Sequence, residues 1–126
     1  MTVPIVAIGR SLVVAIQEDL DDEAAQALET RVASEVGRRG ARGLVLDVSN
    51  LTIVDSFVAR ILDRIVGLVR LQGASAVVVG VRPSVAITLV ELGLSLVNVP
   101  TALDADRGLR LLQELEGDGR RVDGDG

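Results

Sequence analysis

The first forty residues change from an apolar pattern to a helical one. Two apolar runs, residues 4–8 and 12–16, are separated by Gly9 and Arg10, and a glycine at this point permits a tight two-residue turn. We therefore predict an antiparallel hairpin. From Asp21 the apolar residues recur every four positions, and charged residues fill the opposite face. The apolar set is Ala24, Leu28, Val32 and Val36, and the charged set is Glu23, Glu29, Arg31, Glu35 and Arg38.

The same two patterns alternate along the rest of the chain. Short apolar runs rich in branched residues predict strands at residues 43–48, 76–81 and 96–99. Helical spacing and capping residues predict helices at residues 21–39, 56–71, 83–92 and 104–116. In the 56–71 helix the residues expected to face inward are Phe57, Ile61, Ile65, Leu68 and Val69.

Alternating strands and helices predict an α/β fold with right-handed crossovers. We expect a mixed, mainly parallel sheet with an N-terminal antiparallel hairpin and about four helices. The 126 residues favour a single domain. We place that domain at residues 1–116 and expect residues 117–126, GDGRRVDGDG, to form a flexible C-terminal tail because they have no apolar period.

Composition removes most enzyme classes. The chain has no Cys, His, Lys, Trp or Tyr, so thiolate metal sites, histidine bases and Schiff-base lysines are excluded. With 13 arginines against 18 carboxylates, the net charge of −5 disfavours nucleic acid as a partner. No signal peptide and no uninterrupted apolar run of membrane-spanning length is found, so we expect a cytoplasmic protein without a membrane partner.

Two local patterns have structural explanations that we favour over ligand sites. The acidic run from Glu18 to Glu23 lacks the ligand spacing of a calcium loop, and helix capping explains it. The glycines at positions 37, 40 and 43 leave a helix and enter a strand, the reverse of a phosphate-binding loop. We expect neither a metal nor a cofactor. Arg38, Arg39 and Arg42 form a small basic patch that we interpret as a solvated helix end.

The segment from Asp47 to Ser56 is the strongest candidate for function. It leaves the carboxyl end of an interior strand and leads to a helix N-terminus, where open α/β sheets place their binding sites. An enzyme alternative, a small hydrolase or nucleotide-binding protein, would use Asp47, Ser49 and Asp55, but no base for Ser56 is identifiable. Helix capping by Asp55 or Ser56 is the structural alternative.

A central signature and three motifs give this chain a family resemblance. The segment from Asp47-Val48-Ser49 to Asp55-Ser56, followed by an amphipathic helix, resembles the central signature of STAS domains, the fold of bacterial anti-sigma factor antagonists. The three motifs, which point to one branch of that family, are SLVVAIQEDLDD at residues 11–22, DSFVAR at residues 55–60 and PSVAITLVELG at residues 83–93. Over residues 3–116 the chain looks like the small stressosome scaffold of the RsbS type. Many antagonists continue Asp-Ser with a second serine and a glycine, whereas Phe57 and Val58 follow here, as in the stressosome branch.

The resemblance implies a non-catalytic scaffold and antagonist that sequesters a switch serine/threonine kinase with a histidine-kinase-like ATPase fold. It implies phosphorylation of Ser56, which releases the kinase, and removal of the phosphate by a serine phosphatase. Self-association and paralogous STAS partners with sensory N-terminal domains are also implied. A free anti-sigma factor antagonist is the alternative. The loop residues assigned to kinase binding are Asp47, Ser49, Asn50, Thr52, Asp55, Phe57 and Arg60.

Physical chemistry adds two expectations to this resemblance. A phosphate on Ser56 would meet free amides at a helix N-terminus, with Arg60 one turn away and Asp55 opposing it, so modification should change binding without unfolding the domain. Ser49 and Thr52 remain open as secondary phosphosites. Between Pro83 and Leu94 the apolar arc is wide, which fits either a buried helix or a surface that packs on another subunit.

Overall fold

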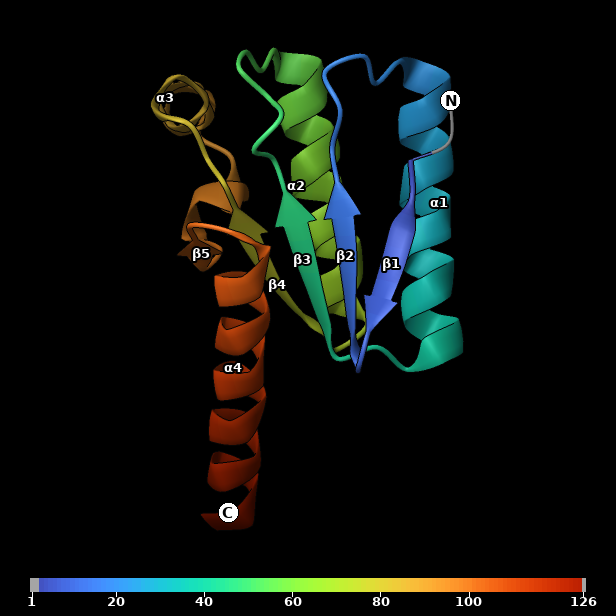
Figure 1. The fold of residues 1–126 in the computed structure, drawn as a ribbon, viewed down its shortest axis with the longest axis vertical. Helices are drawn as coiled ribbons and strands as arrows, with labels where there is room; N and C mark the ends of the chain where they lie inside the picture. The colour runs from blue at the N-terminus through green and yellow to red at the C-terminus, as the bar shows by residue number, and fades with distance from the viewer. Residues whose placement is uncertain (1–2, 126) are drawn as a thin grey trace.

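The computed structural model describes the backbone of residues 3–125 and the side chains of residues 3–117. Over this range five strands form one sheet in the order β1-β2-β3-β4-β5 (Figure 1). The strands are β1 (Ile5–Ile8), β2 (Ser11–Ala15), β3 (Gly43–Asp47), β4 (Ser75–Val79) and β5 (Thr101–Ala102). The helices are α1 (Asp22–Arg39), α2 (Ser56–Leu71), α3 (Pro83–Leu92), the short 3₁₀ helix η1 (Ser95–Asn98) and α4 (Ala105–Asp125).

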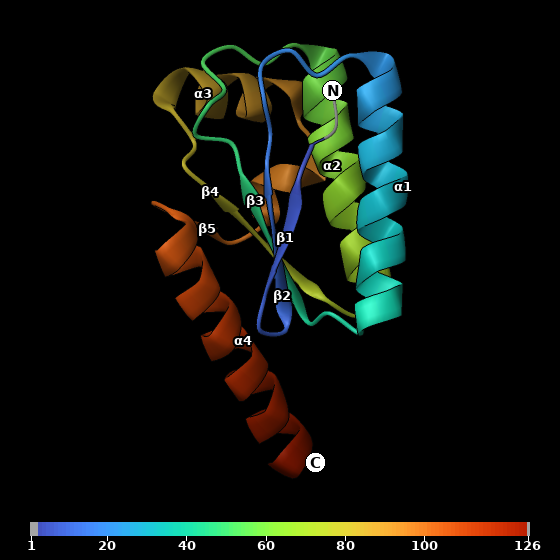
Figure 2. The ribbon, with the colours of Figure 1, turned by 45° about the vertical axis from the view of Figure 1, so that its right-hand side comes forward.

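The sheet is covered unequally on its two faces. β1 and β2 pair antiparallel and every other neighbouring pair is parallel, which confirms the predicted mixed α/β sheet. Helices α1 and α2 cover one face, and α4 crosses the other face and extends past the end of the sheet (Figures 1 and 2). The main core lies under α1, α2 and α3, while a smaller cluster around Val45, Val77, Val79 and Leu112 lies under α4.

The predicted capping residues of α1 explain its ends. The Asp21 side chain accepts a hydrogen bond from the Ala24 N–H at 2.8 Å, and Gly40 closes the helix in the left-handed conformation. Asp21, within the acidic run, and Gly40 therefore cap the two ends of α1 as predicted. No group of three or more acidic residues positioned for a metal ion occurs among the described residues.

The predicted last strand is wrong. Residues 96–99 are not a strand; the last strand is β5, and this segment is mostly the 3₁₀ helix η1. Leu96 and Val99 are buried whereas Val97 is 48% exposed, and a three-residue repeat fits a 3₁₀ turn better than the alternation of a strand.

The last helix ends later than its apolar pattern indicates. It does not stop at residue 116 but continues to Asp125. Helical hydrogen bonding needs no apolar face, and each glycine costs only about 1 kcal/mol, so the end of the apolar period does not mark the end of the helix. Side chains beyond residue 117 lie outside the described residues, and the domain boundary and the flexible tail stay predictions.

Glu29 also departs from its predicted place on the solvent face of α1. It is 9% exposed and forms an ion pair with Arg64 of α2, with 2.8 Å between Arg64 Nε and Glu29 Oε1. The reason is the 3.6-residue period, which places Glu29 beside the buried residues Ala25 and Val32. Burial of this carboxylate is compensated by the two hydrogen bonds that Arg64 donates.

Candidate functional site

The loop between β3 and α2 continues directly from the centre of the sheet. The Ile16 N–H bonds to the Asp47 carbonyl and the Val48 N–H bonds to the Val79 carbonyl, so the parallel ladder reaches the start of the loop. The side chain of Asp47 then accepts a hydrogen bond from the Ser49 N–H at 2.9 Å. Asp47 is half-buried and stabilises this turn, which is the local role of aspartate after a strand.

Buried residues at every third position fix the loop against the core. Leu51 and Val54 are almost fully buried and belong to the main core. Asn50, Thr52 and Ile53 point outward, and Ile53 is 83% exposed. Two apolar anchors on one side therefore hold an accessible surface on the other, which is polar except for Ile53.

Residues from two other loops hold this segment in place. The Glu18 carboxylate accepts hydrogen bonds from the Thr52 N–H, at 2.9 Å, and from the Thr52 hydroxyl. Arg82 Nε donates to the Ser49 carbonyl at 3.0 Å, and the Ser84 hydroxyl donates to the Thr52 carbonyl at 2.8 Å. The turns that follow β2, β3 and β4 are thus joined at the carboxyl edge of the sheet.

No sequence motif marks Glu18, Arg82 or Ser84 as residues of the site. The available signal was their position, because each follows a strand that ends at the same edge as β3. Helix capping explained the acidic run as a whole, yet Asp21 alone caps α1 through its side chain and Glu18 binds Thr52.

Gly80 determines how closely the loop approaches the end of β4. Its φ is +73°, and a Cβ built there would lie 2.7 Å from the Ser49 Cβ and 3.1 Å from the Ser49 Cα. Both the left-handed backbone and the close approach require glycine. The position of Ser49 therefore depends on a residue of the neighbouring strand end.

Asp55 and Ser56 begin α2. Asp55 Oδ1 accepts a hydrogen bond from the Val58 N–H at 2.9 Å, so Asp55 is the capping residue. Ser56 is the first helical residue and is exposed, and its hydroxyl has no hydrogen-bond partner among the described residues. The structure therefore presents an uncovered hydroxyl where the loop meets the helix.

Two further residues assigned to kinase binding lie on α2, at different depths. Arg60 is exposed one turn after Ser56 and forms no ion pair within the described residues. Phe57 is half-buried and packs against the main core. Arg60 is therefore available to a phosphate or a partner, whereas Phe57 mainly supports the first turn of the helix.

The pKa of Glu18 lies below its ordinary value of 4.5, first because the Thr52 hydroxyl and then because the Thr52 N–H donates to its carboxylate. A carboxylate whose pKa is lowered by folding stabilises the folded state at any pH above its ordinary, unfolded-state pKa. This contribution is lost as the pH falls through the lowered pKa. We expect wild type to be more stable than Glu18→Gln near neutral pH and the difference to disappear in acid. Chemical denaturation across this pH range measures it; a difference independent of pH would contradict the assignment.

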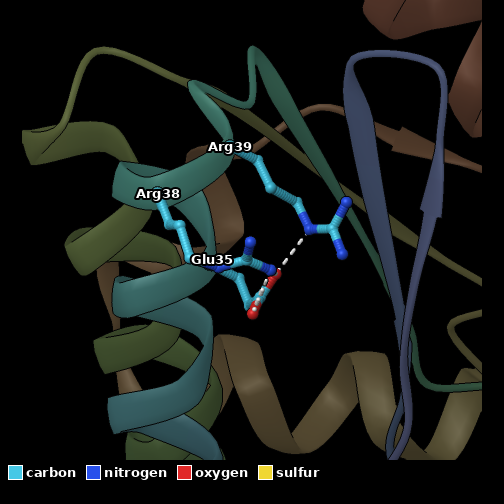
Figure 3. A network of polar contacts seen from close by, with 3 residues as sticks. All are labelled: Glu35, Arg38 and Arg39. Atoms are coloured by element: carbon cyan, nitrogen blue, oxygen red, sulfur yellow. Dashed lines mark hydrogen bonds and ion pairs between the residues drawn. The ribbon is translucent and has the colours of Figure 1, made fainter.

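The predicted basic patch at the end of α1 is partly neutralised. Arg38 and Arg39 both bind the Glu35 carboxylate, with 2.8 Å from Arg38 Nη2 and 2.5 Å from Arg39 Nε to Oε2 (Figure 3). Their hydrogen bonds, that of Arg39 first, hold the pKa of Glu35 below its ordinary value. This patch lies at the opposite end of the strands from Ser56 and takes no part in the candidate site.

Among the described residues, no helix combines the length and hydrophobicity needed to cross a bilayer.

Comparison with known proteins gives consistent matches. Residues 2–106 match the STAS domain family. The fold superposes on RsbS of Moorella thermoacetica, solved as a serine-to-glutamate variant, with a TM-score of 0.83 and 39% identity over 90% of this chain and 97% of that chain. A chain from a structure of the stressosome, described as a signal integration and transduction hub, gives a TM-score of 0.82 and 40% identity. The match covers 90% of this chain and 98% of that chain.

A curated relative matches over a shorter length. The RsbT co-antagonist protein RsbRA of Bacillus subtilis (strain 168) is 28% identical over 96 residues, which are 76% of this chain. The chain spans only 35% of the length of that relative.

Proposed function

Because the chain belongs to the STAS domain family, we propose that it is a non-catalytic scaffold and antagonist of a cytoplasmic bacterial stress-signalling complex. In this role it sequesters a switch serine/threonine kinase with a histidine-kinase-like ATPase fold. Phosphorylation of Ser56 releases the kinase. The observation that carries the proposal is the exposed, unpartnered hydroxyl of Ser56 on a chain 39% identical to RsbS over 90% of its length.

The start of α2 suits a phosphate. The first N–H groups of a helix have no intrahelical acceptor, and Asp55 satisfies only that of Val58. The amides of Ser56 and Phe57 and the positive end of the helix dipole can therefore face the added oxygens. Arg60 adds an unpaired guanidinium one turn away.

The same geometry supports an effect on binding and not on folding. Ser56 is exposed, so its phosphate needs no rearrangement of the core. A kinase that covers the loop would have to desolvate about two added negative charges beside the exposed carboxylate of Asp55. A serine phosphatase would restore the hydroxyl by hydrolysis of the phosphate ester and return the chain to its kinase-binding form.

The proposed partners also include other STAS proteins. The match to RsbRA and to a stressosome chain supports self-association and assembly with longer paralogues that carry sensory N-terminal domains. A free anti-sigma factor antagonist would share the kinase switch but not the assembly. Light scattering with and without such a paralogue separates the two, since only a scaffold forms a larger complex.

Site mapping tests the assignment of the phosphoacceptor. We expect incubation with the cognate switch kinase and ATP to add one phosphate, which mass spectrometry locates on Ser56, and Ser56→Ala to abolish its incorporation. Ser49→Ala and Thr52→Ala are matched controls within the same loop and should still be modified. A phosphate found only outside residues 47–56 would overturn the site.

A further inference from the structure

Ile53 is the one apolar side chain among the residues exposed between Asp47 and Ser56, and we propose that it is the apolar contact through which the switch kinase recognises this chain. It is 83% exposed and lies three residues before Ser56. The other exposed residues of this segment are all polar, namely Asn50, Thr52, Asp55 and Ser56. The inference rests on the proposed function and deepens it by naming a specificity-determining residue besides the phosphoacceptor.

Exposure alone does not make Ile53 a binding residue, because single apolar side chains are common on protein surfaces. The second observation is that the backbone is held on both sides of it. The N–H of the preceding residue, Thr52, donates to Glu18 at 2.9 Å and its hydroxyl donates to the same carboxylate. The Thr52 carbonyl accepts a hydrogen bond from the Ser84 hydroxyl at 2.8 Å. The following residue, Val54, is buried in the main core, so a fixed backbone presents an uncovered side chain.

A β-branched side chain on a fixed backbone loses little freedom when a partner covers it. Isoleucine has few χ1 rotamers, and the hydrogen bonds of Thr52 already order the backbone. Most of the free energy gained by removing the apolar surface of Ile53 from water is therefore available for binding. Well-packed side chains near the centre of an interface, from which water is excluded, contribute most of the affinity.

The composition of the chain leaves this role to an aliphatic residue. Interfaces favour Tyr, Trp, Phe and Arg, but this chain has no Trp or Tyr, and its single phenylalanine, Phe57, is half-buried against the main core. A kinase that reaches the Ser56 hydroxyl also covers the residues around it, because a stable interface buries about 800 Å² on each partner. The partner surface that fits has an apolar pocket for the Ile53 side chain beside the groups that approach Ser56.

Two substitutions at Ile53 separate an apolar contact from an effect of shape. Ile53→Val and Ile53→Thr give side chains of the same shape and the same branching at Cβ, which differ by a methyl group in place of a hydroxyl. In isothermal titration of the full chain with the cognate switch kinase, we expect Ile53→Thr to bind about tenfold more weakly than Ile53→Val. Ile53→Val loses one methylene group and should stay within about fivefold of wild type.

Leu71→Thr is the matched control outside the site. Leu71 is 88% exposed at the last residue of α2, whereas Ser56 is the first residue of that helix. The substitution removes an equally exposed aliphatic side chain and should leave the kinase affinity unchanged. Because Ile53 and Leu71 are both exposed, the variants should unfold at the same temperature as wild type, which thermal unfolding checks.

Three results would overturn the inference. Equal kinase affinities of Ile53→Thr and Ile53→Val exclude an apolar contact. An equal loss of affinity in Leu71→Thr shows that position in the chain has no influence. Loss of the larger complex with a longer STAS paralogue in Ile53→Thr, at unchanged kinase affinity, assigns the residue to assembly instead.

Comparison with the serine variants keeps this test separate from the proposed function. If Ile53→Thr binds weakly while Ser56→Asp and Ser56→Ala bind equally, the Ile53 contact stands and the kinase switch fails. If Ile53→Thr binds like Ile53→Val while Ser56→Asp binds more weakly than Ser56→Ala, the Ile53 contact fails and the kinase switch stands.

Discussion

Ser56→Asp is expected to bind the switch kinase about a hundredfold more weakly than Ser56→Ala. The aspartate places a negative charge on an exposed position next to Asp55, and a kinase that covers the loop must remove water from both carboxylates. A penalty of about 3 kcal/mol corresponds to this change in affinity. Isothermal titration of the kinase against the two variants measures it.

The control for this comparison is a serine outside the candidate site. Ser34 is exposed on α1, so Ser34→Asp adds the same charge without touching the loop, and its affinity for the kinase should match that of wild type. Equal affinities of Ser56→Asp and Ser56→Ala would remove the basis for the switch. A loss in Ser34→Asp as large as that in Ser56→Asp would show that net charge, and not the site, controls binding.

Gly80→Ala should destabilise the folded protein strongly, although it adds only one methyl group. The left-handed backbone at φ +73° costs an alanine about 1–2 kcal/mol. The new Cβ would also lie 2.7 Å from the Ser49 Cβ and 3.1 Å from the backbone of Ser49. Overpacking of this kind costs about 1–3 kcal/mol more. Because Ser49 must move, the kinase affinity should fall as well.

Gly93→Ala separates these two effects. Gly93 has φ +65°, close to that of Gly80, but a Cβ there meets nothing within 4 Å. It should lose only the backbone contribution of about 1–2 kcal/mol and keep its kinase affinity. Urea unfolding gives the stabilities, and equal losses for Gly80→Ala and Gly93→Ala would show that the contact with Ser49 has no effect.

Local patterns were sufficient for most of the fold. The helix over residues 56–71 matches α2 at both ends because Asp55 caps one end and the apolar period stops near Leu71. The strand predicted at residues 96–99 is wrong because three apolar residues and one asparagine cannot distinguish a strand from a 3₁₀ turn without the neighbouring core. Glu29 was misplaced because a four-residue repeat approximates the true helical period only over short stretches.

One part of the candidate site can be predicted from neighbouring residues, and another part depends on contacts between residues far apart in the sequence. Asp55 as cap and Ser56 as the first helical residue follow from adjacent positions in the sequence. The bonds from Thr52 to Glu18 and from Arg82 to Ser49 join residues more than thirty positions apart, and only the parallel order of β2, β3 and β4 brings them together. No short-range pattern encodes such contacts.

Release of the kinase from a preformed complex is the most direct test of the account. The kinase is bound to unmodified chain, ATP is added, and dissociation and phosphate incorporation are followed together by fluorescence anisotropy and mass spectrometry. The account predicts that release follows the appearance of phosphate on Ser56 while the circular dichroism of the chain stays unchanged. Full phosphorylation of Ser56 with the kinase still bound would contradict it.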